Sequence, residues 1–379
     1  MDVRLLYIDR NWELRSRLIA VRQFNSTSEI LESGRFCALF EEYLTTVFEE
    51  FNLDVNMIFS ATSDAGNNVR RVCDRLLPEL WEWCVCHMLN CALVEAIGTH
   101  VDPQKSANPA ARRVVVVKKA VEHIHKSPRA KVNTLEKQVW RYSQFSFHKL
   151  VNAAPQRWCS VCNVREVVIV NRAAIDGVCG EEGKDNPLTA YMDEIEELYS
   201  LIKPVANLIV TCQQTHVPTE QAAVLGLAVL RLSKFNVDSP LDILTPALSL
   251  AQVGAAGAGG GEQKASSAPK AHADLTQVAR DARKHFTSTV NKQWFNKRYD
   301  SPATENTDFV VDMQMVLYPT AADLQYVDKL ASTAEHAATV KETIRKKVIA
   351  LAVELAKTEA QRTENRRGGQ GSPAAKRAR

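Results

Sequence analysis

The sequence has no run of eighteen or more apolar residues, so no segment of it predicts a membrane-spanning helix. Its first ten residues, MDVRLLYIDR, lack the apolar stretch of a secretory signal, and we therefore expect no signal peptide. The sequence also has little excess of positive over negative charge, because the formal net charge is only +3. A nucleic-acid-binding surface would therefore have to come from local basic patches.

The composition that is present is that of a globular protein. Hydrophobic residues make up 45% and charged residues 24% of the chain. The length of 379 residues predicts one large domain with an insertion, or two domains. The nine cysteines are odd in number and irregularly spaced. This pattern favours free thiols in a reducing compartment.

The first hundred residues alternate between strand and helix patterns. Two alternating segments within residues 1–25 predict short strands joined by a turn at Asp9–Asn11. A helical period from Ile30 to Phe51 predicts an amphipathic helix, and Met57–Thr62 is typical of a buried strand. Residues 80–97 are expected to begin as a strand and continue as a helix. Further helices are predicted at 69–77, 113–150, 163–175, 187–214, 219–232, 274–296 and 320–360.

Four short segments, in this order, resemble the central part of hAT-family transposases, which are ribonuclease H-like nucleases. They are Tyr7–Leu14 with the following Leu18–Val21, Ala61–Asn68 (ATSDAGNN), Cys84–Asn90 (CVCHMLN) and the pair Arg157-Trp158. The first resembles the second and third strands of the nuclease fold. The others resemble a Thr-x-Asp-x-Gly-x-Asn turn, a Cys-x-x-His motif and an Arg-Trp pair. The resemblance spans roughly residues 5–330.

The chemistry of that family requires three carboxylates that hold two divalent metal ions. By resemblance Asp64 is the second of these, a vestigial catalytic and metal-binding residue, although a turn-forming or helix-capping aspartate explains it equally well. The first carboxylate would lie upstream of Met1, and no third is found towards the C-terminus. The chain is therefore expected to be incomplete at both ends and not to cleave DNA. It is expected to hold no cofactor, whereas Mg²⁺ or Mn²⁺ would be bound if it were active.

The remaining candidate site residues would bind DNA or support the fold. By resemblance Arg157 and Trp158 lie near the active site, while a core tryptophan beside a surface arginine is the alternative. Arg70 and Arg71 form a basic cluster that can contact phosphates, or simply a solvated helix face. Cys84 and His87 are expected to pack behind the Asp64 strand. A zinc site that adds Cys159 and Cys162 is a second interpretation of those two residues.

We expect an α/β fold, with an incomplete ribonuclease H-like mixed sheet followed by a large, mostly α-helical region. The expected parts are a partial ribonuclease H-like domain at 1–175, a helical insertion-like region at 176–249, a flexible Gly/Ala/Ser linker at 250–272, a helical region at 273–360 and a disordered basic tail at 361–379.

The leading hypothesis is a transposase-derived protein without cutting activity that retains DNA or protein binding. Two alternatives stay open. One is an active Mg²⁺- or Mn²⁺-dependent nuclease, and the other is a helical protein-interaction module with no nucleic-acid role. We expect no membrane and no small-molecule substrate as partners. The tail residues Arg366-Arg367 and Lys376–Arg379 resemble a nuclear-localisation signal, which predicts a nuclear protein.

Overall fold

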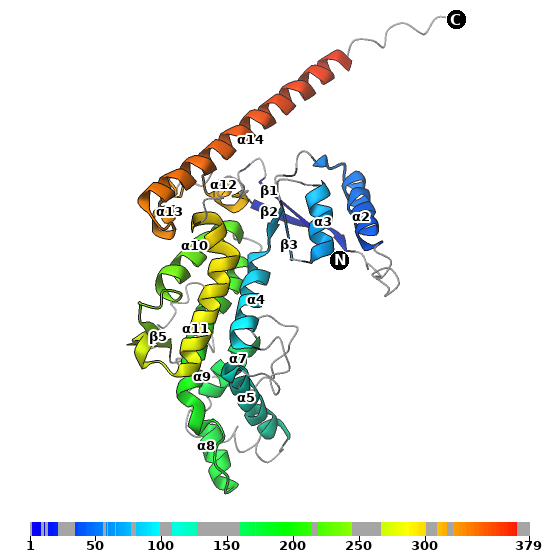
Figure 1. Ribbon diagram of the computed structural model, residues 1–379. Helices are drawn as coiled ribbons and strands as arrows, with labels where there is room; N and C mark the ends of the chain where they lie inside the picture. The colour runs from blue at the N-terminus through cyan, green and yellow to red at the C-terminus, as the bar shows by residue number, and fades with distance from the viewer. Residues whose placement is uncertain are drawn as a thin grey trace, which may run out of the picture. The chain divides into compact units, whose positions relative to one another are not determined.

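The chain forms two compact units in a computed structural model, residues 1–293 and 294–379 (Figure 1). The structure describes residues 2–8, 11, 14–21, 35–55, 58, 60–64, 66–76, 81–98, 108–126, 160–170, 172–213, 219–244, 267–300, 309–316 and 321–369. Most of these residues are helical, so an α/β chain with a large helical region is confirmed. The boundary between the units falls inside the helical region expected at 273–360.

The chain begins with an antiparallel hairpin. Strand β1 (Asp2–Ile8) pairs with β2 (Leu14–Val21), and the register shifts between Val3 and Arg4. The hairpin confirms the two strands predicted from alternation. Asp9 and Arg10, two residues of the expected turn, lie outside the described residues.

A segment with two short parallel strands follows the hairpin. It consists of helix α2 (Phe36–Glu50), strand β3 (Ala61–Ser63), helix α3 (Asn67–Leu76) and strand β4 (Trp81–Trp83). The two strands run parallel, and α2 packs on α3 with Phe40 and Val47 buried. A crossover helix is what joins two neighbouring parallel strands. Within the described ranges, the β1–β2 and β3–β4 pairs belong to separate two-stranded sheets, so the expected single mixed sheet is not formed there.

Helices form the body of unit 1, around the long helix α9 (Met192–Cys212). Helix α9 contacts helices on several sides, and α11 lies along α4 as well (Figure 1). A continuous apolar face that includes Ile195, Leu198 and Ile209 is buried, as the helical period predicted. The other helices here are α4 (Val85–Ile97), α5 (Pro109–Lys126), α7 (Ser160–Val170), α8 (Arg172–Glu181), α10 (Thr219–Ser233) and α11 (Gln277–Val290).

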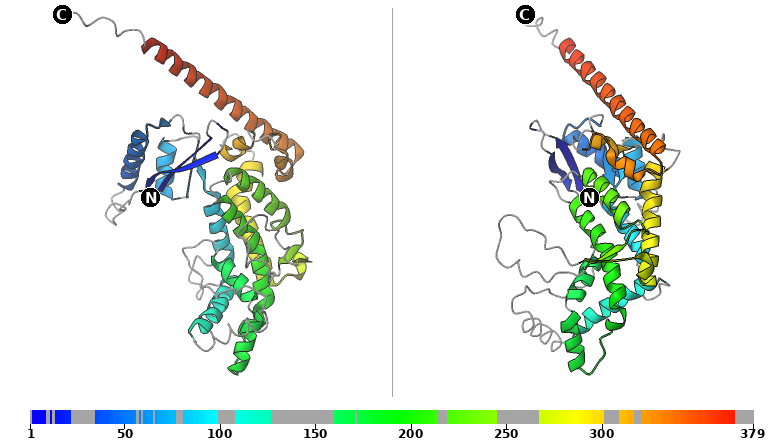
Figure 2. Two further views of the ribbon diagram at one scale, coloured as in Figure 1. Left: turned by 180° about the vertical axis from the view of Figure 1, so that it is seen from behind. Right: turned by 90° about the vertical axis from the view of Figure 1, so that its left-hand side faces the viewer.

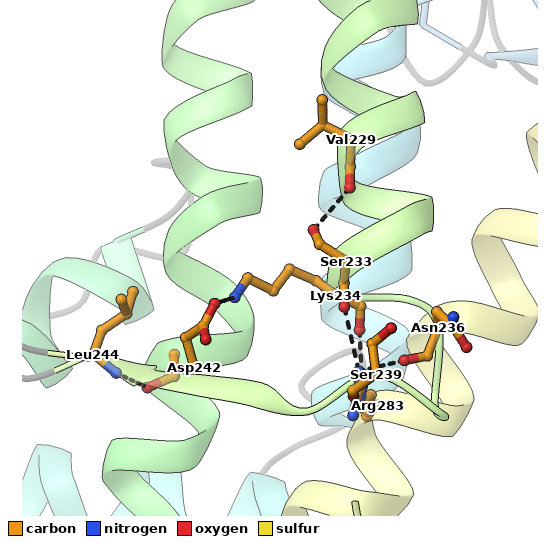
Figure 3. A network of polar contacts seen from close by, with 9 residues as sticks. Val229, Ser233, Lys234, Asn236, Ser239, Asp242, Leu244 and Arg283 are labelled. Atoms are coloured by element: carbon orange, nitrogen blue, oxygen red, sulfur yellow. Dashed lines mark hydrogen bonds and ion pairs between the residues drawn. The ribbon is translucent and has the colours of Figure 1, made fainter. Parts of the chain in front are cut away.

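A buried arginine joins α11 to the end of α10 (Figure 3). The Arg283 guanidinium donates to the backbone carbonyls of Lys234 at 2.8 Å, Asn236 at 2.6 Å and Ser239 at 2.9 Å. Carbonyls at a helix C-terminus have no partner within the helix, and a cation there also complements the helix dipole. Arg283 therefore closes α10 and fixes the turn that leads into strand β5 (Leu241–Leu244).

The end of the segment expected to be a linker is ordered, which corrects that expectation. Residues Ser267–Lys270 form strand β6, which pairs antiparallel with β5. The buried Glu197 carboxylate accepts hydrogen bonds from Lys270 Nζ and, at 2.9 Å, from the backbone N–H of Thr276. These contacts attach the strand to α9 and to the start of α11. Strand pairing and an ion pair to the buried Glu197 thus order a segment whose composition alone favours disorder.

The second unit packs helices around a buried carboxylate. It holds most of the π-helix η4 (Asn291–Asp300), then α12 (Val310–Val316), α13 (Gln325–Leu330) and α14 (Ala334–Gly369). Asp312 is fully buried and accepts from Arg298 Nη1 at 3.0 Å, Tyr299 Oη at 2.7 Å and Tyr326 Oη at 2.7 Å. Burial first, and then the Asp312 carboxylate, raise the pKa of the Tyr326 phenol, which keeps it a donor.

Helix α14 also corrects the expected tail. Figure 2 shows it as one continuous helix, and it includes residues 361–369, for which the sequence predicts disorder. Residues 370–379 lie outside the described part of the chain. None of the described helices is both long enough and apolar enough to cross a membrane.

Candidate functional site

The candidate site lies at the carboxyl edge of β3 and β4. Because the two strands are parallel, with Ser63 opposite Trp83, the residues that follow them emerge at the same edge. Asp64 follows β3 directly, and Cys84 follows β4 directly. The backbone N–H of Cys84 donates to the Ser63 carbonyl at 2.8 Å, which extends the pairing by one residue.

Asp64 occupies the turn between β3 and α3. Its side chain is exposed, and its Oδ1 accepts a hydrogen bond from the backbone N–H of Gly66 at 3.2 Å. A Cβ at position 66 would lie 3.1 Å from that same oxygen, so glycine lets the turn close tightly. This is a local side-chain turn of the kind that Asp favours. The turn-forming interpretation of Asp64 is therefore confirmed.

Arg70 is held above an aromatic ring beside this turn. Its guanidinium carbon lies 5.1 Å from the centroid of the Trp81 ring, a distance suited to a cation–π interaction. The indole N–H of Trp81 donates to Ser63 Oγ at 2.8 Å, which orients the ring. The backbone N–H of Arg70 also bonds to the Gly66 carbonyl at 2.9 Å. Arg70 thus combines an exposed position with a side chain whose direction is restrained.

The other cations of α3 differ in their surroundings. Arg71 is exposed at the next position along the helix. Arg75, one turn further, pairs with Glu41 of α2 at 3.0 Å. Arg70 and Arg71 are thus two exposed cations near the start of α3, whose N-terminal backbone attracts negative charge.

Cys84 and His87 lie at the start of α4, next to the same edge. Cys84 is the N-cap residue and is half-buried, and the His87 ring lies 6.3 Å from that of Trp83. The thiol of Cys86, which sequence reasoning did not single out, contacts Cys84 and donates to the Ile209 carbonyl of α9 at 3.7 Å. The contact with Cys86, together with burial, raises the pKa of the Cys84 thiol. The packing role expected of Cys84 agrees with this arrangement.

The zinc interpretation finds no support in the described ranges. No group of three or more His, Cys, Asp or Glu side chains is arranged there to hold a metal ion. Cys162 is buried in α7, and Cys159 lies outside the described residues. Whether the protein binds Mg²⁺ or Mn²⁺ is not tested by this geometry.

The structure brings Asp64 and Cys84 to one strand edge and places Arg70 in the helix that follows Asp64. Arg157 and Trp158 lie outside the described residues, so their expected approach to Asp64 stays a prediction. Sequence reasoning missed Trp81 and Ser63, which together hold Arg70 in place. The Trp-Glu-Trp alternation at 81–83 signals a strand, but its parallel pairing with β3 joins residues twenty positions apart.

Comparisons with known proteins do not assign this chain to a family. A scan against models of protein families found no match, and a search among curated proteins found no similar sequence.

Proposed function

We propose that this chain is a transposase-derived protein that binds duplex DNA without cutting it. The single observation that carries DNA binding is the presence of two exposed basic residues near the start of α3, Arg70 above the Trp81 ring and Arg71 at the next position. Arginine binds phosphate through a planar fork of donors, and a helix N-terminus adds its own N–H groups. A phosphate of the DNA backbone fits this combination of charge and geometry.

The order of elements supports the ribonuclease H-like part of the proposal. An antiparallel hairpin, a helix, a strand that ends at Asp64, a crossover helix and a parallel strand follow one another in unit 1. This is consistent with the resemblance of residues 7–21 and 61–68 to the nuclease fold. Asp64 supplies one carboxylate at this edge, whereas a two-metal nuclease needs three, and we therefore propose binding rather than cleavage.

DNA binding is tested by its dependence on salt. Each phosphate contact contributes a slope of about −0.9 to the plot of log affinity against log salt concentration. Replacing both Arg70 and Arg71 by alanine should weaken binding. It should also make the slope shallower by about twice the contribution of one phosphate contact. The matched control is Lys118→Ala with Lys119→Ala, which removes the same charge from the exposed face of α5. Fluorescence anisotropy of a labelled duplex measures both variants.

Two results would contradict the proposal. Equal loss of affinity in the α3 and α5 variants would mean that binding is not located at α3. Undetectable binding even at low salt would favour the protein-interaction alternative. Separately, Mg²⁺- or Mn²⁺-dependent nicking of supercoiled DNA that Asp64→Ala abolishes would replace this proposal with an active nuclease.

A nuclear location is the second part of the proposal. The basic residues Arg366-Arg367 and Lys376–Arg379 support it, because short basic runs are read as nuclear-import signals. A fluorescent fusion of the full chain should accumulate in the nucleus, and replacing these five basic residues with glutamine should redistribute it. A fusion that stays outside the nucleus would remove this part.

A further inference from the structure

Helix α14 carries an apolar stripe that continues beyond the core of the second unit. Where the helix begins, α12 and α13 pack against it, and the side chains buried there are Ala337, Val340 and Ile344. After Ile344 no described side chain of the helix is buried. The same face nevertheless continues, at steps of three and four residues, with Val348, Leu351 and Leu355. The first two of these are half-exposed and Leu355 is 44% exposed, so the stripe meets solvent.

This part of α14 has the spacing of a coiled-coil seam. Two helices supercoil around each other when apolar residues recur alternately three and four positions apart. The mostly apolar run Val348–Ala356 is about 14 Å long as a helix, which is less than half of the roughly 30 Å hydrocarbon core of a membrane. Another apolar helix is therefore the partner that removes the stripe from water.

The charges beside the stripe favour an antiparallel partner. Lys347 precedes Val348 and Glu354 precedes Leu355, so both line the same edge of the stripe, one heptad apart. When two copies of this helix run in opposite directions, that edge meets itself, and Lys347 of each copy lies opposite Glu354 of the other. A parallel alignment would instead place the three cations at 345–347 beside the same cations of the second copy, and like charges repel.

We propose that α14 pairs with α14 of a second copy of this chain, as an antiparallel coiled coil through Val348, Leu351 and Leu355. The interface is two-fold symmetric, so one helix face supplies both complementary surfaces. Val348 of one copy packs on Leu351 of the other, beside the two Lys347–Glu354 pairs. Such a short contact is small for a stable interface, so we expect a dissociation constant on the order of micromolar.

Sedimentation equilibrium of the full chain over a range of concentrations tests the pairing. The natural chain should pass from monomer to dimer as its concentration rises, and Leu351→Glu should remain monomeric. Val353→Glu is the matched control, because Val353 is 47% exposed on the face of the helix opposite the stripe. This control should dimerise like the natural chain. Circular dichroism establishes that the helices of each variant are intact.

A charge exchange tests the direction of the partner helix. Lys347→Glu makes both ion pairs repulsive and should weaken dimerisation about tenfold. Adding Glu354→Lys to that variant restores opposite charges and should return the affinity to within about threefold of the natural chain.

Three results would overturn the proposal. They are a natural chain that is monomeric even at about 100 μM, a Leu351→Glu variant that dimerises as well as Val353→Glu, and a double charge variant that dimerises no better than Lys347→Glu. A monomeric natural chain that binds vesicles of anionic lipid would assign the stripe to a membrane surface instead. Because these measurements contain no DNA, none of the outcomes bears on the function proposed above.

Discussion

The buried carboxylate of Asp312 should determine whether the second unit stays folded. Asp312→Ala removes the acceptor for two tyrosine hydroxyls and the counter-charge of Arg298, whose side chain is 6% exposed. Removing one partner of a buried ion pair costs about 3–5 kcal/mol, because the other charge is left in a medium of low polarity. Each buried hydroxyl without an acceptor adds about 1–3 kcal/mol if it cannot rearrange. We expect a total loss of about 4 kcal/mol, since such contributions overlap.

A second aspartate in the same unit is the matched control. Asp328 pairs with Lys341 at 2.5 Å, but its side chain is 50% exposed. An exposed pair of this kind contributes about 0–1 kcal/mol, because solvent and salt screen it. The difference between Asp312→Ala and Asp328→Ala should therefore be about 3 kcal/mol, or roughly a hundredfold in the opening equilibrium. Asp312→Asn, which keeps acceptor oxygen for the tyrosines and loses the charge, should fall between the two.

Hydrogen exchange followed by mass spectrometry is the appropriate assay, because it localises the loss of stability within the full chain. Amides of α12, α13 and the first turns of α14 should exchange about a hundredfold faster in Asp312→Ala than in Asp328→Ala. Peptides from the interior of α9 should be unaffected if the two units open separately. The reasoning is refuted if both variants exchange at the same rate in α12 and α13.

Three further predictions concern unit 1. Gly226→Ala should destabilise it by about 1–3 kcal/mol in urea unfolding, since the new Cβ would lie 2.3 Å from Leu208 Cδ1. Gly180→Ala, where nothing lies within 4 Å, should instead stabilise by up to about 1 kcal/mol, and equal effects would contradict this. Arg283→Met should cost about 3 kcal/mol, because buried carbonyls lose a charged donor, and a change below about 0.5 kcal/mol would argue against the cap. Burial, and then neighbouring arginine and lysine charges, lower the pKa of His272, so the unfolded chain takes up the proton first as pH falls below about 6.5. Stability should thus decrease from pH 7 to pH 5, and His272→Gln should show a smaller decrease; identical pH profiles would exclude this residue as the cause.

Local patterns in the sequence predicted most of the helices and the N-terminal hairpin. The buried apolar positions of α9 and α10 follow the helical repeat, and the alternation in residues 3–7 gives a strand because successive side chains in a strand face opposite sides. The turn at Asp64 was likewise predictable, since aspartate and glycine favour such turns through bonds that span two residues. These features depend on interactions between residues that are close in the sequence, so the sequence pattern predicts them.

Other features depend on pairings between distant residues, and only the tertiary structure decided them. Strand β6 is ordered because β5 pairs with it and the buried Glu197 binds Lys270, although its own composition predicts a linker. Arg70 acquires a fixed direction because β4 brings Trp81 beside β3. The sequence by itself determined where most helices, strands and turns form. The contacts that order β6 and that fix the direction of the Arg70 side chain arose from packing. That division has a physical basis, because backbone periodicity is a local property and burial is a property of the whole fold.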